Sequence, residues 1–336
     1  MTRPLRGLEA FQDHLERLAR RGRAHHALLV TGMRGCGKRT LARALARGRL
    51  CTADVDERGA FGCGHCGPCG RVDREQHTDL TVVEREAGKT RVPVEVLRNL
   101  VDELMRGSLE GRGRVAILID ADRLQREGQN ALLKTLEEPA PRTTLILTAE
   151  RPEALLDTVR SRCERVAVPG LPEEELCAAL SEHTALEPAA IERYARLARG
   201  SLGLAHAFAE GAFTDLEARC RSVFDARERT RVAPQAFAQR VLDGVEPGEE
   251  GIRQAKVLRA RSALRLVLAL AHEAALQQAT DDPWRIVEHA FDALGDLDLG
   301  LAADIVLAGF FASVTSSAAK SDRATARSRP RASEAR

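Results

Sequence analysis

Four of the eight cysteines have a spacing that suits a metal ion. The spacing is C-x11-C-x2-C-x2-C, and its members are Cys51, Cys63, Cys66 and Cys69. Four thiolates around Zn²⁺ leave no position for water, so the pattern predicts a structural zinc site and not a catalytic one. His65 lies inside the same segment and could replace one thiolate. The alternatives are free cysteines that lie close by coincidence and a redox-active pair.

A glycine-rich stretch, GMRGCGK at residues 32–38, is the second chemical feature. The residues that would contact a nucleotide here are Gly32, Gly35, Gly37, Lys38 and Thr40. Backbone N–H groups of such a loop, the N-terminus of the helix after it and its lysine favour phosphate oxygens. A short apolar run precedes the stretch and helical spacing follows it, which is the context of a phosphate-binding loop. A glycine-rich turn that only reverses the chain is the alternative.

Several groups that ATP hydrolysis needs are missing from their usual positions. Arg39 follows the lysine where a Ser or Thr would hold Mg²⁺, and Thr40 comes one place late. Asp120, at the end of an apolar run, is followed by Ala121 where a glutamate would activate water. Asp122 comes next, and we predict that it caps the following helix. The residues predict no intrinsic ATPase activity and leave the binding of ATP or ADP open.

Strands and helices alternate through the first half of the chain. Apolar runs predict strands at residues 26–31, 80–83, 114–120 and 143–148. Helical spacing predicts helices after the glycine-rich loop, from near Pro93, and at 130–138. This alternation indicates an α/β fold with a parallel sheet flanked by helices.

Beyond about residue 171 only helices are predicted. Gly and Pro residues divide the segment up to 211 into three short helices. The longest helical pattern, residues 253–279, is expected to form a core helix of a further all-helical region. The last stretch, residues 319–336, has six Lys and Arg against two Asp and Glu and little to bury, so we expect a disordered basic tail.

The composition excludes some classes of protein. A net charge of +2 is too small for a strong grip on a polyanion over the whole surface, and 3% aromatic residues leave few side chains for base stacking. No stretch has the 18 or more apolar residues of a membrane span, and the N-terminus lacks the apolar core of a signal peptide. We therefore expect a cytoplasmic protein with no membrane contact, in which cysteines bind metal or stay free.

Four motifs in a fixed order carry a resemblance to a known family. The glycine-rich loop and the cysteine insert are followed by NALLKTLEEP at residues 130–139 and by SRC at 161–163. The chain thereby resembles the bacterial DNA polymerase III clamp-loader subunits over roughly residues 24–205, and its last third matches only in length and helical character. The resemblance implies an AAA+ P-loop domain with a zinc-binding insert, a small helical lid and an all-α collar.

The resemblance also implies domain boundaries. The AAA+ domain would span residues 1–168, with the zinc module at 50–78. The lid would span 169–211 and the collar, through which the ring assembles, 212–318.

Within this family, three positions separate the ATP-hydrolysing tau/gamma branch from the non-hydrolysing delta-prime branch. The motor has Thr, Glu and a lid sensor arginine where this chain has Arg39, Ala121 and Gly203. All three favour the delta-prime branch, so the implied partners are tau/gamma and delta subunits and, through the complex, the sliding clamp and primer-template DNA. In the family the SRC arginine, here Arg162, enters the ATP site of the neighbouring subunit, where it stabilises phosphate charge. An arginine in a surface salt bridge is the alternative for Arg162.

Two other functions compete with this interpretation. The first is a tau/gamma-type motor in which Thr40 and Asp122 take over the missing roles. The second is a free-standing zinc-containing nucleic-acid-binding protein, against which the near-neutral charge and the few aromatic residues argue.

Overall fold

The structure is a computed structural model, and it describes residues 5–20, 25–85, 92–210, 213–220, 223–225, 231–245, 252–277, 282–298 and 301–327. Two compact units make up the chain, Met1–His206 and Ala207–Arg336. All predicted site residues lie in the first unit, because the last of them is Gly203.

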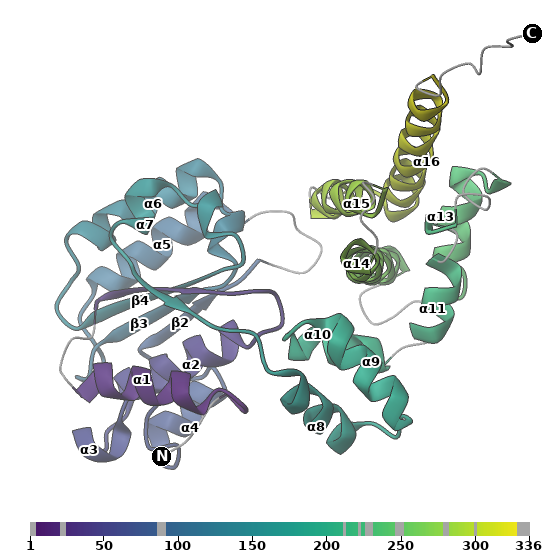
Figure 1. Cartoon of the computed structure of the whole chain (residues 1–336). Helices are drawn as coiled ribbons and strands as arrows, with labels where there is room; N and C mark the ends of the chain where they lie inside the picture. The colour runs from purple at the N-terminus through teal and green to yellow at the C-terminus, as the bar shows by residue number, and fades with distance from the viewer. Residues whose placement is uncertain are drawn as a thin grey trace, which may run out of the picture. The chain divides into compact units, whose positions relative to one another are not determined.

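A parallel five-stranded sheet with the order β2-β3-β4-β1-β5 is the centre of the first unit (Figure 1). Its strands are β1 Ala27–Thr31, β2 Leu80–Val83, β3 Arg114–Leu118, β4 Thr143–Ala149 and β5 Glu164–Ala167. Every residue of β1 and β4 is buried, as expected for central strands that helices cover on both faces. The predicted parallel α/β sheet is therefore confirmed.

Strand β5 is a correction to the sequence analysis, which predicted no strand after residue 148. The Ser161–Cys163 block comes before this strand and not after the last strand of the sheet. β5 has only four residues, lies at an edge and buries only Val166, so it lacks the continuous apolar run that marks the other strands.

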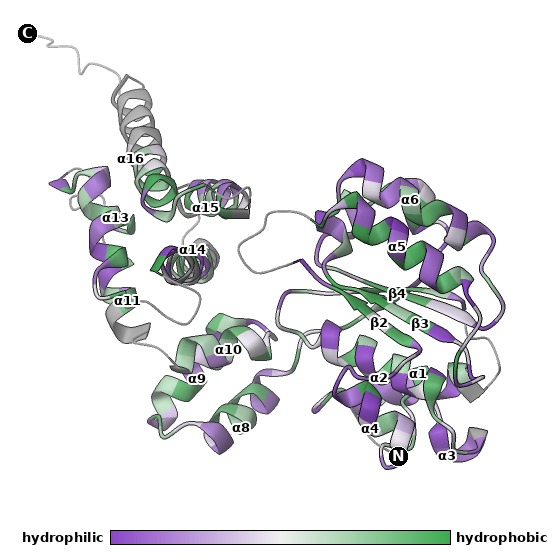
Figure 2. Cartoon of the chain, turned by 180° about the vertical axis from the view of Figure 1, so that it is seen from behind, coloured by the Kyte–Doolittle hydropathy of each residue, from purple (hydrophilic) through white to green (hydrophobic). Residues whose placement is uncertain are grey.

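Helices cover both faces of the sheet (Figure 1). One face carries α1 Glu9–Arg20, α2 Lys38–Leu50, α3 Val55–Arg58 and α4 Gly67–Asp73. The other carries α5 Val94–Met105, α6 Arg126–Glu137 and the short α7 Asp157–Arg160. Separate apolar clusters fill the two interfaces, and Figure 2 shows the strands as hydrophobic between helices with hydrophilic outer residues. Short 3₁₀ turns, η1 Ala121–Arg123 and η2 Pro152–Ala154, follow β3 and β4.

Three short helices follow the sheet, as predicted. They are α8 Glu173–His183, α9 Pro188–Ala198 and α10 Leu202–Glu210. Pro188 starts α9, and Arg199 ends it in a left-handed conformation.

The second unit contains helices α11 Phe213–Cys220, α13 Pro234–Leu242, α14 Ile252–Gln277, α15 Asp282–Asp298 and α16 Ala303–Arg327. Within its core the ring of Phe237 stacks on that of Phe311, with ring centroids 4.4 Å apart. Helix α16 continues to Arg327, so the backbone of residues 319–327 is helical where the sequence predicted disorder. The alanines of this stretch favour a helix once the helix before it is packed. Residues 328–336 of the predicted tail lie outside the described residues.

Candidate nucleotide and metal sites

The glycine-rich loop at residues 32–38, predicted to bind phosphate and called the phosphate-binding loop from here on, follows β1 and leads into α2. Lys38, the first residue of α2, is buried, and its Nζ donates hydrogen bonds of 2.9 Å to the carbonyl oxygens of Gly32 and Met33. The lysine ammonium thus binds the loop itself. Leu5 lies against the end of the loop, because a Cβ added to Gly37 would be 2.6 Å from the Leu5 Cδ2.

The segment that opens α10 lies directly on the phosphate-binding loop. Ser201 Oγ donates to the Arg34 carbonyl at 2.7 Å, and the Gly203 N–H donates to the Gly35 carbonyl at 3.0 Å. A Cβ added to Gly203 would be 3.0 Å from the Gly35 Cα, and one added to Gly35 would be 2.4 Å from the Ser201 Oγ. A side chain at either glycine would therefore require the two segments to separate.

Arg39 and Thr40 both lie on the first turn of α2, outside the loop. The Arg39 guanidinium pairs with Glu84 at 2.5 Å and with Glu75 at 3.2 Å. These carboxylates balance the charge of Arg39, and Thr40 is exposed.

Asp120 lies at the carboxyl end of β3, where its backbone adopts the left-handed conformation with φ 52°. Its N–H donates to Thr148 Oγ1 on β4 at 2.9 Å, and its carboxylate lies 3.8 Å from the Arg123 Nε. Ala121, the position of the missing glutamate, is completely buried. No carboxylate can occupy that place without displacing the core around it.

The predicted role of Asp122 as a helix cap is wrong. Its carboxylate accepts a hydrogen bond of 3.1 Å from the Arg151 N–H in the connection after β4, and α6 has Gln125 at its N-cap without a side-chain hydrogen bond. Burial raises the pKa of Asp122. Asp122 therefore joins two turns at this end of the sheet.

The four cysteines predicted as zinc ligands come together at the end of α2 and the start of α4. All four Sγ atoms lie within 4.8 Å of one another. The closest Sγ pairs, Cys51–Cys63, Cys51–Cys66 and Cys63–Cys69, are 3.6, 3.8 and 3.9 Å apart. A tetrahedral ion with Zn–S bonds of about 2.3 Å requires sulfurs roughly 3.8 Å apart, so the cluster is compatible with a structural zinc ion.

The thiols of this cluster are not equivalent. Burial raises the pKa of Cys51 and of Cys69. For Cys66, burial opposes ionisation, but hydrogen bonds from Thr52 and Cys69 outweigh it and lower the pKa to about 6. A bound zinc ion would displace the protons of the other thiols.

Helix α2 positions the cluster through a close contact with the insert. A Cβ added to Gly48 would be 2.0 Å from the Ala60 carbonyl oxygen, so only glycine permits this approach. The neighbouring Arg47 side chain donates to the Phe61 carbonyl at 2.7 Å and to the Asp73 carboxylate at 3.0 Å. His65 is exposed and contacts Glu57 at 3.1 Å, so the four-cysteine set is complete without it.

Arg162 lies between α7 and β5 and is half-buried. Its guanidinium donates to the Thr158 carbonyl at 3.0 Å and pairs with Glu137 at 2.8 Å. Glu164, two residues later, is level with Leu28 at the start of β1, whereas the phosphate-binding loop follows the end of β1. Arg162 therefore lies where the parallel strands begin, whereas the phosphate-binding loop of its own chain lies where they end.

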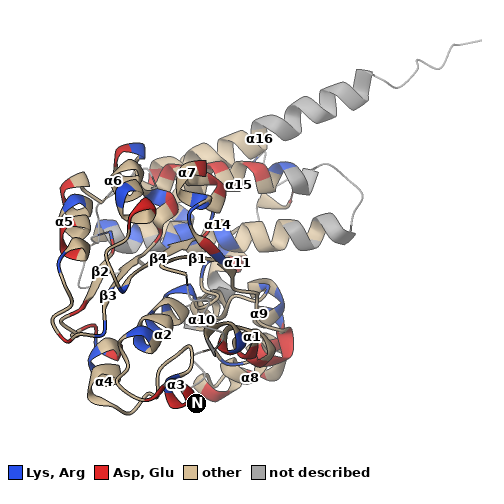
Figure 3. Ribbon diagram, turned by 90° about the vertical axis from the view of Figure 1, so that its left-hand side faces the viewer, with Lys and Arg blue, Asp and Glu red and all other residues tan. Residues whose placement is uncertain are grey.

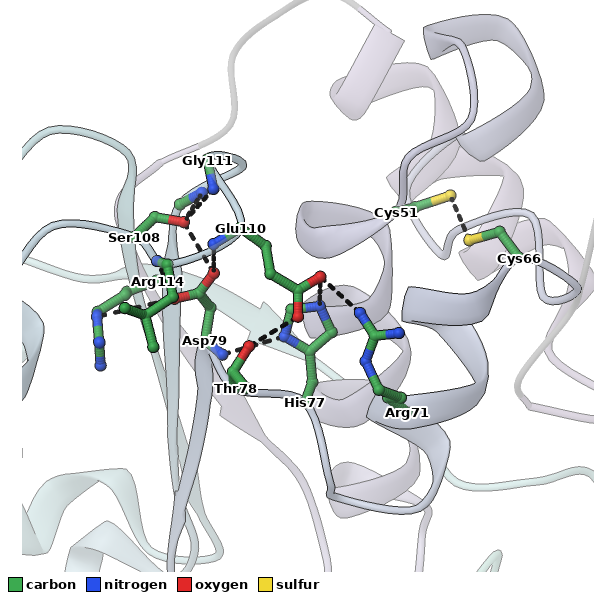
Figure 4. A network of polar contacts seen from close by, with 12 residues as sticks. Cys51, Cys66, Arg71, His77, Thr78, Asp79, Ser108, Glu110, Gly111 and Arg114 are labelled. Carbon is green, nitrogen blue, oxygen red and sulfur yellow. Dashed lines mark hydrogen bonds and ion pairs between the residues drawn. The ribbon is translucent and has the colours of Figure 1, made fainter.

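A polar network that the sequence analysis missed connects the insert to the sheet (Figure 4). The buried Asp79 carboxylate accepts hydrogen bonds from Ser108 Oγ and from the N–H groups of Leu109 and Glu110, all at 2.8 to 2.9 Å. The Glu110 carboxylate in turn pairs with Arg71 of α4 at 2.5 Å. The partners are about thirty residues apart in the chain, so local spacing carried no signal for this contact.

His77 lies between the two carboxylates of this network. The Asp79 N–H donates to its Nδ1 at 3.1 Å, so in the neutral ring the proton is on Nε2, 3.5 Å from a Glu110 oxygen. Burial lowers the pKa of His77, which favours this neutral form.

The comparisons with known proteins agree with the resemblance to DNA polymerase III clamp-loader subunits. A family model described as "DNA polymerase III, delta subunit" matches residues 7–172. Through this region the chain belongs to the DNA polymerase III clamp-loader family, which contains delta-prime and tau/gamma subunits. In the described residues, no helix has both the length and the apolar character needed to cross a membrane.

Relatives from both branches are similar to the chain. It is 36% identical over 190 residues to DNA polymerase III subunit delta' of Escherichia coli, a match that covers 56% of this chain and 56% of that protein. It is also 36% identical over 186 residues to DNA polymerase III subunit tau of Escherichia coli, which covers 54% of this chain and 28% of that protein. The chain thus spans about half or less of the length of these relatives.

A gamma subunit-related protein from Thermotoga maritima is similar in structure, with 16% identity, a TM-score of 0.49, and coverage of 92% of this chain and 99% of that one. The strand order and the loop after β1 define the fold.

Proposed function

We propose that this chain is a delta-prime-type subunit of a DNA polymerase III clamp loader that does not hydrolyse ATP. The observation that carries the proposal is the contact between Gly203 and Gly35, at 3.0 Å between N and O. A sensor arginine at position 203 would have its Cβ 3.0 Å from the Gly35 Cα, so it would require the backbone of the loop to move away from α10.

Two further positions support the same conclusion. Arg39 cannot bind Mg²⁺, and its guanidinium is engaged by Glu84 and Glu75. Ala121 is buried and has no group that could accept a proton from water. The carboxylate of Asp122 is directed to the Arg151 N–H, which argues against its use as a substitute in a tau/gamma-type motor.

The proposed role is to complete a ring with tau/gamma and delta subunits that places the sliding clamp on primer-template DNA in the cytoplasm. Arg162 would serve the ATP site of a neighbouring subunit. Arg162 lies at the opposite end of the strands from the chain's own phosphate-binding loop, which supports an action on another subunit. The four cysteines would hold one structural zinc ion.

The proposal is tested in a clamp loader reconstituted from the subunits of the same organism. Arg162→Ala should leave assembly intact and lower clamp- and DNA-stimulated ATP hydrolysis severalfold. An arginine supplied to a neighbouring phosphoryl-transfer site is worth about 10³ to 10⁵ in rate in GTPases, and here only one of several sites would lose it. Arg162→Lys should restore little, because an ammonium lacks the planar fork.

The matched control is Arg160→Ala. Arg160 lies two residues before Arg162, and its guanidinium pairs with Asp157. This variant should leave the ATPase rate unchanged. Equal rates for Arg162→Ala and the unaltered complex would contradict the trans role. ATP turnover by the isolated chain at the rate of a motor subunit would contradict the delta-prime assignment in favour of the tau/gamma type.

A further inference from the structure

A cavity of about 750 Å³ lies in the first unit at the edge where the strands begin. The phosphate-binding loop follows the end of β1, so the cavity and that loop lie at opposite ends of the parallel strands. Its volume falls within the range of about 300 to 1,000 Å³ that is usual for small-molecule sites. Residues from α1, α2 and the starts of four strands converge on it, which makes it concave.

The lining combines an apolar floor with an excess of positive charge. Buried apolar residues of the floor include Leu15, Leu28, Leu45 and Val115. Four guanidinium groups line the cavity, from Arg49, Arg58, Arg112 and Arg142. The lining includes one carboxylate, Glu164, and one imidazole, His26.

Among the described residues, none of the four guanidinium groups forms an ion pair with a carboxylate. Three of them donate to backbone carbonyls instead: Arg49 to His25 at 3.2 Å, Arg112 to Thr52 at 3.0 Å, and Arg142 to Gly111 at 2.9 Å. These bonds orient the side chains but do not neutralise their charge. Arg49 lies at the end of α2, where the ribbon is blue at Lys and Arg positions in Figure 3.

The positive charge of Arg58 acts on Arg49. Burial lowers the pKa of Arg49, and the charge of Arg58 lowers it further, while Glu164 opposes the effect. Guanidinium groups held close together in a partly buried place are stabilised when an anion lies between them. Phosphate matches the fork of a guanidinium well, and planar rings stack on its face.

We propose that this cavity binds a phosphate-bearing organic anion of nucleotide size. Its phosphates would contact Arg49 and Arg58, and its less polar part would cover the leucine floor. This site is separate from the degenerate phosphate-binding loop and does not depend on the proposed clamp-loader role. An acidic segment of a partner protein fits less well, because the lining belongs to a cavity of ligand size within one unit.

The test uses the full-length protein carrying Lys38→Ala, so that the phosphate-binding loop contributes little, and isothermal titration with ATP and with inorganic triphosphate. ATP should bind, with an affinity that falls as salt rises, and more tightly than triphosphate. Arg58→Glu should weaken ATP binding about tenfold or more, since it removes a guanidinium that would bond to the phosphates and adds a carboxylate that repels them. The control Arg98→Glu makes the same charge change on an exposed position of α5 and should have no effect.

Several results would overturn the proposal. They are undetectable ATP binding, equal affinities for ATP and triphosphate, unchanged binding in Arg58→Glu, and saturable binding of a polyglutamate peptide in place of ATP. The Arg58 side chain makes no hydrogen bond or ion pair with another described residue, and only its backbone N–H bonds, to the Asp54 carbonyl at 2.9 Å, so replacing the side chain should not disturb folding. If Arg58→Glu nevertheless lowers the melting temperature, Arg58→Gln removes the positive charge without adding a negative one and should still weaken ATP binding severalfold.

Discussion

At position 203 the backbone of α10 packs against the backbone of the phosphate-binding loop. The Gly203 N–H bonds to the Gly35 carbonyl, and the Ser201 hydroxyl bonds to that of Arg34. The lysine of the loop is used internally as well, since Lys38 binds the carbonyls of Gly32 and Met33. At the residue scale, groups that would meet a nucleotide in a working motor hold one part of this chain against another.

We expect Gly203→Ala to destabilise the first unit by about 1 to 2 kcal/mol. Alanine is the better helix former by about 1 kcal/mol, but its Cβ would be 3.0 Å from the Gly35 Cα, and overpacking costs more than the helix gains. The control is Gly295→Ala in α15, where an added Cβ meets nothing within 4 Å and should stabilise its unit by about 0.5 to 1 kcal/mol. Urea unfolding checks both variants, and equal effects would show that the contact at Gly203 tolerates a side chain.

At the scale of elements, the insert between α2 and β2 is attached at two places. The cysteine cluster joins the end of α2 to α4, and the network around Asp79 joins α4 to the loop before β3. One attachment is a cluster of thiols and the other a polar network, while the sheet keeps its own apolar clusters. The insert should therefore be separable from the sheet in its response to change.

Cys66→Ser should reduce zinc content well below one ion per chain and increase proteolysis within residues 51–77, while the far-ultraviolet circular dichroism of the sheet and its helices is retained. The thiol of Cys66 has its pKa lowered to about 6 and so supplies a thiolate at neutral pH, which a serine hydroxyl cannot. Elemental analysis and limited proteolysis provide the measurements. Cys177→Ser, on α8 outside the cluster, should change neither, and full zinc content in Cys66→Ser would contradict the ligand assignment.

Asp79 should make the stability of the first unit depend on pH. Burial raises its pKa, but the N–H groups of Leu109 and Glu110, the Ser108 hydroxyl and Arg114 together lower it. Because the folded pKa is depressed, this stabilisation is complete above the ordinary Asp pKa of about 4 and is lost as pH falls through the folded value.

Replacement tests the same contact. Asp79→Asn should cost about 1.5 to 3 kcal/mol at pH 7, since an amide cannot accept all of these bonds, and should flatten the loss of stability below pH 4. Denaturation between pH 3 and pH 7 measures this. An unchanged pH profile in Asp79→Asn would assign the acid sensitivity to other carboxylates.

At the scale of the whole molecule, each compact unit has its own core. Apolar clusters lie on both faces of the sheet in the first unit, and Phe237 and Phe311 stack in the second. The division after His206 lies within α10, so a useful cut must come after that helix ends at Glu210.

A fragment of residues 1–212 should fold with a cooperative thermal transition and bind zinc, yet fail to co-purify with the partner subunits of the proposed clamp loader. The physical reason is that the sheet cores are complete without the second unit, whereas the proposed collar supplies the assembly surface. Calorimetry and a pull-down with the partner subunits measure the two properties. A fragment that assembles as well as the full chain would remove the role that we propose for residues 212–318.

The sequence alone determined the features that depend on residue type and short spacing. The cysteine pattern, the glycine-rich loop, four of the five strands and the replacements Arg39, Ala121 and Gly203 are all local properties, because neighbours in the chain set them. Tertiary structure decided what distant segments do to one another. It paired the edge strand β5 with β1, gave Asp122 the Arg151 N–H as its partner, and gathered four arginines around one cavity. Such contacts arise only when the sheet brings remote turns together, and no local pattern encodes that geometry.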